Sequence, residues 1–247
     1  MPKQPWPPDQ PEVDALLLES AAEDYALLAS GSNYVFLVTL RHAAAGSGYA
    51  VYKPRRGEAP LWDFPGGTLY MRERAAYLVS EALGWRLIPP TVTREEGLEH
   101  GIGVLQLFIE HDPAQHFFNL RESRADELKR VALFDWLTNN ADRKGGHCIV
   151  GVDGRMWCID QGLTFHAEDK LRTVIWDYQG QPVPPALIAD VCRLGEQIES
   201  DETLRSSLAE LLSEGELAAL LRRVELIDRA RVFPAPPPYR PYPWPMI

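Results

Sequence analysis

The apolar residues of the chain follow two different spacings. Where they recur every three or four positions, the pattern predicts a helix with one buried face; where Val, Ile, Tyr and Phe alternate or run together, it predicts a strand. The predicted helices span residues 13–29, 70–85, 122–138, 184–198, 201–212 and 214–232. The predicted strands span residues 33–40, 48–54 and 103–110, followed by a hairpin over 147–160.

The order of these elements predicts the fold class. Strands are concentrated in residues 13–109, which we expect to form an N-terminal lobe that contains a sheet. Residues 33–40 and 48–54 are expected to pair in antiparallel fashion. Helices dominate residues 110–232, the expected C-terminal lobe. This arrangement is typical of an α+β protein with two lobes, and a ligand is expected in the crevice between them.

Both ends of the chain are rich in proline, over residues 1–12 and 233–247. Proline is incompatible with regular helix, so we expect extended tails. Such tails either pack along the surface or serve as recognition segments for a partner. The aromatic residues Tyr239, Tyr242 and Trp244 favour a C-terminal tail that docks on the body of the protein.

Composition narrows the classes of partner. The 247 residues are 45% hydrophobic and 24% charged, which is ordinary for a globular protein with a sizeable core. The formal net charge of −10 argues against a general grip on nucleic acid and against stable association with anionic membranes. The three cysteines fit neither a disulfide framework nor a zinc spacing, and no apolar run is long enough to span a bilayer. We therefore expect a cytoplasmic protein.

The segment NNADRKGGHCIVGVDGRMWCID concentrates polar residues between a predicted helix and a predicted hairpin. A two-residue turn at Asp153 and Gly154 would place His147 opposite Asp160, with both side chains on the same face. Asp142 precedes His147 by five residues, in the loop that leads to the same end of the hairpin. A loop of three residues would change this register.

These residue types suit phosphate chemistry. Carboxylate oxygens are good ligands for a magnesium ion that carries nucleotide phosphates, and a further carboxylate can orient a hydroxyl nucleophile. Imidazole is a softer ligand, so His147 would bind magnesium weakly, tolerate manganese or contact phosphate. The ordinary alternatives are a helix cap or turn for Asp142, a strand histidine for His147 and a turn residue for Asp160. Arg143 and Lys144 either form a solvated loop or neutralise a transferred phosphate.

Two groups of motifs together resemble a known family. NADRKGGH at residues 140–147, followed by IDQGLTF at 159–165, is similar to the catalytic and metal-binding segments of the phosphatidylinositol 3-/4-kinase-like branch of the protein-kinase-like fold. Upstream, AVYKPRRGEAPLWDFPGGTLYMRERAAYLVSEALGW resembles the nucleotide-lysine strand and the following helix. The resemblance covers roughly residues 27–170 and extends to bacterial HipA-type kinases and a small actinobacterial kinase-like family. It implies a two-lobed protein-kinase-like fold.

The resemblance implies how ATP would be held. Lys53 would contact the α- and β-phosphates, and Glu73 would pair with Lys53, with Glu81 as the rival for that pairing. Further contacts with the nucleotide are implied for Gly31, Ser32 and Asn33 over the phosphates and for Gln106, Leu107, Phe108 and Ile109 at the adenine.

The same resemblance implies the catalytic and metal-binding residues. Asp142 would be the catalytic carboxylate, and Asp160 would bind Mg²⁺ or Mn²⁺. His147 stands where the family usually has an amide ligand for the metal, which places ordinary magnesium use in doubt. Asp135, on the helix before Asp142, is either an ordinary surface charge or an anchor for the loop.

The function that follows is an ATP- and metal-dependent kinase that moves the γ-phosphate to a hydroxyl acceptor. The acceptor can be a protein serine or threonine, a small polyol or a lipid head group. A catalytically weak nucleotide-binding pseudokinase or scaffold is an alternative, which His147 and the unusual DQG motif favour. An AMP transferase on the same fold is a second alternative. A metal-dependent hydrolase is a third, but it would leave Lys53 and Glu73 without a role.

Overall fold

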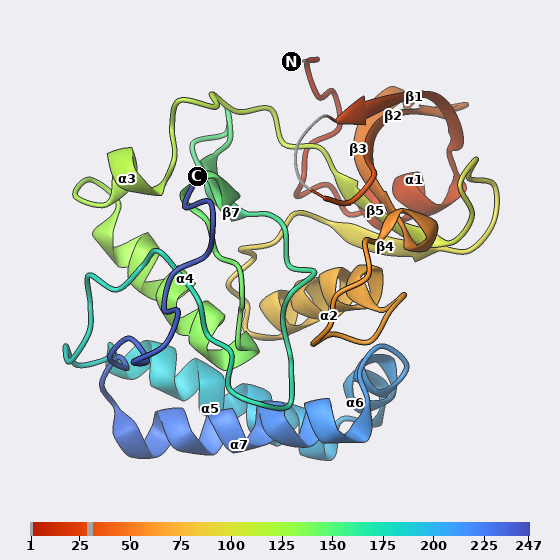
Figure 1. The fold of residues 1–247 in the computed structure, drawn as a ribbon. Helices are drawn as coiled ribbons and strands as arrows, with labels where there is room; N and C mark the ends of the chain where they lie inside the picture. Colours follow the sequence, from red (N-terminus) through yellow and green to blue (C-terminus); the bar gives the residue numbers. More distant parts are fainter. Residues whose placement is uncertain (1, 29–31) are drawn as a thin grey trace.

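The computed structural model describes residues 2–28 and 32–247 and has two parts, an antiparallel sheet near the N-terminus and a helical part that follows it (Figure 1). Within these residues the sheet has five strands in the order β1-β2-β3-β5-β4. The strands are β1 (Ala21–Leu28), β2 (Val35–His42), β3 (Gly46–Pro54), β4 (Thr91–Arg94) and β5 (Gly103–Leu107). The predicted α+β class, with a sheet-bearing N-terminal part and a helical C-terminal part, is confirmed.

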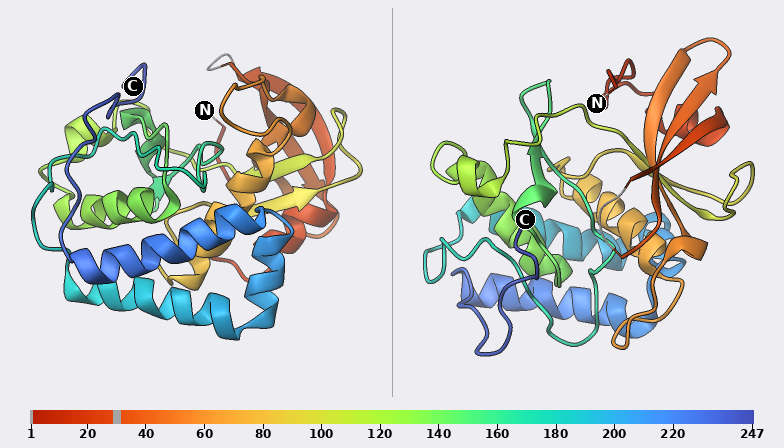
Figure 2. Two further views of the ribbon diagram at one scale, coloured as in Figure 1. Left: turned by 60° about the horizontal axis from the view of Figure 1, so that its bottom comes forward. Right: turned by 45° about the horizontal axis from the view of Figure 1, so that its top comes forward.

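The helices lie mainly on one side of the molecule, where α5 and α7 run side by side beneath α4 (Figures 1 and 2). They are α1 (Val13–Glu19), α2 (Leu69–Ala82), α3 (Phe117–Leu120), α4 (Ala125–Thr138), α5 (Pro185–Ser200), α6 (Glu202–Ala209) and α7 (Glu214–Ala230). Two short 3-10 turns, η1 (Arg55–Gly57) and η2 (Gly145–His147), and the hairpin strands β6 (Cys148–Val150) and β7 (Met156–Cys158) complete the fold. Within the described residues, no helix combines the length and apolar character needed to cross a membrane.

The predicted helix over residues 13–29 is wrong beyond Glu19. The chain becomes extended at Ser20, and β1 then pairs antiparallel with β2, with Asp24 forming a bulge at a φ of 48°. Ala29 lies outside the described residues. The apolar spacing fits a helix, but β2 would otherwise present an unpaired edge of N–H and C=O groups. Pairing with that edge outweighs the weak local preference for helix.

The two faces of the sheet differ in burial at β3. Ala50 and Tyr52 are fully buried beneath α1 and Trp6, whose indole lies where Gly48 has no Cβ. Because side chains alternate along a strand, Lys53 points to the opposite face, where the side chains of β3 are only partly buried. The N-terminal tail and α1 therefore close one face of the sheet and leave the Lys53 face open.

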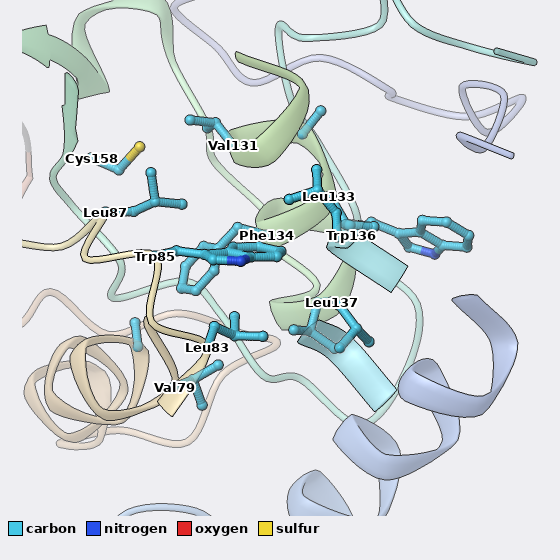
Figure 3. Packing of buried hydrophobic residues seen from close by; sticks show 14 of the residues in the cluster. Val79, Leu83, Trp85, Leu87, Val131, Leu133, Phe134, Trp136, Leu137 and Cys158 are labelled. Carbon is cyan, nitrogen blue, oxygen red and sulfur yellow. The ribbon is translucent and has the colours of Figure 1, made fainter. Parts of the chain in front are cut away.

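α2 lies between two strands in sequence but is anchored to the helices. Its Val79, and Leu83 directly after its last residue, belong to the same buried core as Phe134 of α4 (Figure 3). Arg72 of α2, with a side chain only 1% exposed, forms an ion pair with Glu216 of α7. These contacts hold α2 in place relative to the C-terminal helices.

The register predicted for the hairpin is wrong by one residue. Cys148 pairs with Cys158, so the loop holds three residues rather than two. Gly154 occupies the last loop position at a φ of 79° and donates its N–H to the carbonyl of Gly151 at 2.8 Å. A three-residue loop with glycine in this left-handed conformation is a common way to close a hairpin. His147 consequently lies opposite Ile159 and not Asp160.

Candidate active site

The open face of the sheet brings one cation and two carboxylates together. Lys53 forms an ion pair with Glu73 of α2, and its Nζ lies 3.2 Å from Oδ1 of Asp160. The Glu73 side chain is 2% exposed and that of Asp160 is 50% exposed, so the cluster is closed on the helix side and open toward solvent. The structure thus gathers three of the predicted site residues from β3, α2 and the segment after β7.

The charges in this cluster shift one another's ionisation. Burial lowers the pKa of Lys53, but the carboxylates of Asp160 and Glu73 outweigh that effect and raise it above its usual value. Burial raises the pKa of Glu73, and Lys53 offsets part of that rise. The neighbouring Lys53 ammonium is the main reason that the pKa of Asp160 is lowered. Lys53 and Asp160 are therefore charged at neutral pH.

Glu81 does not take part in this cluster. It lies two helical turns beyond Glu73, and its Oε2 is 3.9 Å from Nε of Arg86. Burial is the largest cause that raises its pKa, and Arg86 partly offsets the rise. Of the two glutamates considered as partners of Lys53, the structure places Glu73 in contact.

His147 and Asp160 meet although the hairpin register differs from the prediction. Nε2 of His147 lies 3.4 Å from Oδ2 of Asp160. The contact depends on irregular backbone at both ends, because His147 ends the η2 turn and Asp160 has a φ of 61°. Regular strand alternation alone would not bring these two side chains together.

The hydrogen bonds of His147 indicate which ring nitrogen carries the proton. The backbone N–H of Lys144 donates to Nδ1 at 3.3 Å, so a neutral ring holds its proton on Nε2, which faces Asp160. Burial lowers the pKa of His147 to about 4; the Asp160 carboxylate opposes this effect, and the nearby cations add to it. The imidazole is therefore neutral at physiological pH.

Asp142 lies in a tight turn directly after α4. Its N–H donates to the Asn140 side chain at 2.9 Å, and its Oδ2 is 2.8 Å from Nζ of Lys144. Burial raises the pKa of Asp142, Lys144 counteracts that rise, and the Asp160 carboxylate adds to it. Lys144 is thus directed at the predicted catalytic carboxylate.

Arg143 points the other way, into the protein. Its guanidinium and the Asp135 carboxylate form an ion pair at 2.9 Å, and both side chains are 0% exposed. The same guanidinium donates to the carbonyl of Ile159 at 3.0 Å and to Oε1 of Gln161 at 3.0 Å. Arg143 therefore links the loop that carries Asp142 to the two neighbours of Asp160. The sequence offered Arg143 only as a loop or phosphate-binding residue, and nothing in its spacing from Asp135 marked a buried pair.

The residues predicted over the phosphates are only partly described. Gly31 lies outside the described residues, and Ser32 is exposed. Oδ1 of Asn33 accepts a hydrogen bond from the N–H of Ala59 at 2.8 Å, which ties the start of β2 to the loop after η1. A role for Ser32 and Asn33 in nucleotide binding stays a prediction.

The residues predicted at the adenine lie at the end of β5. Gln106 and Leu107 are buried in the sheet, and the Gln106 side chain donates to Oγ1 of Thr91 at 2.9 Å. The carbonyl of Phe108 accepts a hydrogen bond from the side chain of Gln4 at 3.1 Å. Ile109 is also buried. The Gln106 side chain and the Phe108 carbonyl are thus engaged within the protein.

An apolar strip beside Lys53 was not predicted as part of the site. Leu37 and Val51 lie directly opposite each other on β2 and β3, and both are partly buried. Val51 is two residues from Lys53, so it shares the open face. Apolar side chains next to a few placed charges are typical of a cofactor site. The alternation of side chains along residues 48–54 was the sequence signal that could have placed Val51 on the same face as Lys53.

Comparisons with known proteins give the family and the fold of the chain. No family model matches the sequence. Protein Rv2133c of Mycobacterium tuberculosis (strain ATCC 25618 / H37Rv) is 36% identical over 266 residues, which cover 94% of this chain and 94% of that protein.

Three solved structures, two of them named as kinases, have a similar fold. The Golgi casein kinase with Mn/ADP bound aligns with a TM-score of 0.55 at 15% identity, over 88% of this chain and 74% of that chain. Hydra Fam20 with sugar aligns with a TM-score of 0.55 at 16% identity, over 88% and 86% of the two chains. The Helicobacter pylori proinflammatory kinase CtkA aligns with a TM-score of 0.53 at 11% identity, over 88% and 94%. The fold is therefore kinase-like, and by its sequence the chain belongs to the family of protein Rv2133c of Mycobacterium tuberculosis.

Proposed function

We propose that the protein is an ATP- and metal-dependent phosphotransferase that moves the γ-phosphate of ATP to a hydroxyl acceptor. The observation that carries this proposal is the convergence of Lys53, Glu73 and Asp160 on the open face of a kinase-like sheet. The Golgi casein kinase of similar fold was solved with Mn and ADP, which supports a nucleotide and a divalent metal for this chain as well.

Lys53 is proposed to bind the α- and β-phosphates. Its two carboxylate neighbours raise its pKa, so it keeps a positive charge at any physiological pH. Glu73 holds the ammonium from the buried side and leaves the solvent side for phosphate. The apolar strip of Leu37 and Val51 would then take the adenine ring. This arrangement positions the nucleotide before any chemistry takes place.

Asp142 is proposed to orient the acceptor hydroxyl and to accept its proton. Lys144, 2.8 Å from that carboxylate, is well placed to neutralise the phosphoryl group as it is transferred. Arg143 is not available for this role, because its guanidinium is buried and paired with Asp135. The proposal therefore assigns the two cations of the loop to different tasks.

The donor set suits a divalent metal that arrives with the nucleotide. Asp160 is ionised and half exposed, and Oε2 of Glu73 is buried without a hydrogen-bond partner. Within the described residues, no group of three or more His, Cys, Asp and Glu side chains is arranged to hold a metal by itself, so phosphate oxygens would complete the coordination. When bound, Mg²⁺ or Mn²⁺ neutralises charge on the phosphates.

His147 is proposed to orient Asp160. In the tautomer that accepts the Lys144 N–H, Nε2 carries a proton and lies 3.4 Å from Oδ2 of Asp160, where it is placed to interact with that carboxylate. The ligand role predicted from the sequence needs the opposite tautomer. His147→Leu should therefore weaken metal–nucleotide binding about tenfold with Mg²⁺ and Mn²⁺ alike. This factor corresponds to the free energy of roughly one hydrogen bond. A loss confined to Mn²⁺, which imidazole prefers, would instead support direct coordination.

The primary test is nucleotide binding by thermal shift. Saturating ATP with Mg²⁺ or Mn²⁺ should raise the Tm by about 5 °C or more, and ATP without metal should raise it less. No shift with either metal would rule out the proposal. Asp142→Asn should retain the shift but lose turnover, since Asp142 is assigned to the acceptor and not to the nucleotide.

Labelled ATP separates the proposal from its alternatives. Transfer of label from γ-labelled but not α-labelled ATP is expected for a kinase, and the reverse for an AMP transferase. Binding without any transfer, unchanged in Asp142→Asn, would indicate a pseudokinase, the alternative favoured by His147 at an amide position and by the direct pairing of Asp142 with Lys144.

The acceptor is proposed to be a hydroxyl compound, and three classes are to be compared: a protein serine or threonine, a small polyol and a lipid head group. The net charge of −10 makes an anionic lipid surface the least favoured of these. The specific resemblance to phosphatidylinositol 3-/4-kinases and HipA-type kinases, and the lobe boundaries at residues 13–109 and 110–232, stay predictions.

A further inference from the structure

The C-terminal tail runs alongside the loop that carries Asp142. The C-terminal end of the described chain lies next to the β6–β7 hairpin (Figure 1), although it is far in sequence from the loop that carries Asp142. Two residues of the tail, Pro241 and Met246, accept hydrogen bonds through their backbone carbonyls, from the loop just after Arg143 and from the segment that holds Thr173 and Trp176. The segment from Pro241 to Met246 is called the strap below.

The first anchor of the strap is inside the loop itself. The N–H of Gly145 donates to the carbonyl of Met246 at 2.7 Å. Gly145 directly follows Lys144 and starts the η2 turn that ends at His147. A Cβ at Gly145 would lie 2.8 Å from the ring of Phe118 and 3.4 Å from the Met246 carbonyl, so the strap and α3 enclose this position tightly.

The second anchor is on the segment that follows the hairpin. The carbonyl of Pro241 accepts hydrogen bonds from the N–H of Thr173 and from Nε1 of Trp176, both at 3.1 Å. The hydroxyl of Thr173 in turn contacts Oδ2 of Asp135 at 3.3 Å. The strap therefore connects Gly145 to the network around Asp135.

The strap is held by its backbone and not by its aromatic side chains. Tyr239 is 86% exposed and Trp244 is 89% exposed, although the sequence suggested that these rings dock the tail. The strap does contact the body, through carbonyl groups and the buried Pro243. Attachment of this kind satisfies the groups that donate to the strap carbonyls, and one of them is the buried N–H of Gly145.

We propose that Met246 is a positioning residue of the active site, which holds the η2 turn in the shape that presents Lys144 and His147. This proposal rests on the proposed function. Without the Met246 carbonyl, the N–H of Gly145 would lose its acceptor, and an unpaired buried donor favours rearrangement of the turn. Lys144 directly precedes that turn and His147 ends it, so both would lose their alignment with Asp142 and Asp160.

Two truncations form a matched test. Removing Ile247 alone leaves Met246 with a terminal carboxylate that can still accept from Gly145. Removing Met246 and Ile247 deletes the acceptor and leaves the Pro241 anchor intact. Amide hydrogen exchange of Gly145 should be unchanged in the first variant and about tenfold faster in the second, the effect of losing roughly one hydrogen bond. Equal exchange in the two variants would overturn the proposal.

Kinetics distinguish positioning from a general loss of stability. In the two-residue truncation, kcat should fall about tenfold while the KM for ATP changes less than about twofold, because Lys53 and Glu73 are not attached to the strap. A KM effect with unchanged kcat, or equal kinetics in both truncations, would contradict the proposal. If the full chain shows no turnover at all, the proposed function fails, and the exchange of Gly145 still decides whether Met246 holds the turn.

A side-chain variant tests the second anchor. Trp176→Phe keeps a buried ring but removes the Nε1–H that donates to Pro241. Exchange of Gly145 should rise about two- to threefold, less than after truncation, because the N–H of Thr173 still holds Pro241. No change in either exchange or kcat would show that the two anchors act independently and would overturn the idea of a continuous strap.

Discussion

Two ion clusters lie on either side of Asp142, and they differ in access to water. The Asp135–Arg143 pair is fully enclosed, and hydrogen bonds to Ile159 and Gln161 complete its network. In the cluster of Lys53, Glu73 and Asp160, by contrast, the Asp160 carboxylate is half exposed. A closed pair is not available to bind a ligand, because its hydrogen bonds are already made within the protein. An open cluster can exchange its partners for phosphate or metal.

The difference assigns separate tasks to neighbouring residues. Arg143 and Lys144 are adjacent cations in one loop, but one holds the loop from inside and the other faces Asp142. Charge alone therefore does not identify a phosphate-binding residue. The exposure of the side chain and the number of its partners within the protein decide whether a cation is free to bind phosphate. Both properties can be tested separately from activity.

The largest effect is expected from breaking the closed pair. Asp135→Ala would leave the Arg143 charge buried without a partner, which should lower the free energy of unfolding by about 3–5 kcal/mol. Urea denaturation measures this. Glu225→Ala is the matched control, because it removes an exposed pair with Arg229 and should cost less than about 1 kcal/mol. A loss below that of the control would mean that the buried pair is not a scaffold.

Acid should destabilise the open site through His147. Its pKa is about 4 in the folded chain against a usual value of 6.5, so the unfolded chain takes up the proton first as the pH falls. Stability present above pH 6.5 is then lost progressively down to about pH 4, by up to about 3 kcal/mol. His147→Asn should flatten this part of the stability profile. The same slope in both proteins would contradict the assignment.

Lys53→Met should separate activity from stability. Loss of the phosphate-binding charge should reduce kcat/KM for ATP by about 100-fold. The free energy of unfolding should fall by only about 1–2 kcal/mol, less than in Asp135→Ala, because Glu73 can take up a proton and Asp160 keeps its access to water. Paired turnover and denaturation measurements on the two variants provide the check. A greater loss of stability than in Asp135→Ala would reverse the comparison.

The smallest effect is expected at Glu81. Glu81→Gln should leave the KM for ATP within about twofold, since Glu81 lies 3.9 Å from the exposed Arg86 and away from Lys53. Glu73→Gln should raise that KM about tenfold, because the neutral amide no longer holds the ammonium in place. Similar KM values for the two variants would show that the contact of Glu73 with Lys53 does not serve nucleotide binding.

Several parts of the site were readable from local pattern. The alternation over residues 48–54 predicted a strand, and the helical spacing over residues 70–85 predicted the helix that carries Glu73. Both elements are present, as β3 and α2. Their side-chain period depends only on residues a few positions apart, so the sequence carries it directly. The fold class followed from the order of such elements.

Other parts of the fold and of the site depended on contacts with residues that are distant in the chain. β1 was mistaken for helix because the free edge of β2 cannot be seen in the spacing of residues 21–28. The approach of His147 to Asp160 was expected for the wrong reason, since it comes from irregular backbone and not from strand pairing. The partners of Arg143 and Gly145 likewise lie outside their local segment.

The sequence by itself determined which residue types are available for phosphate chemistry and on which kind of element each one lies. Only the tertiary structure decided that Arg143 is enclosed, that Lys144 faces Asp142 and that the chain end holds Gly145. The physical reason is that a periodic pattern reports which side of an element is buried. The unpaired charges and N–H groups left by local structure find their partners wherever folding brings the chain together.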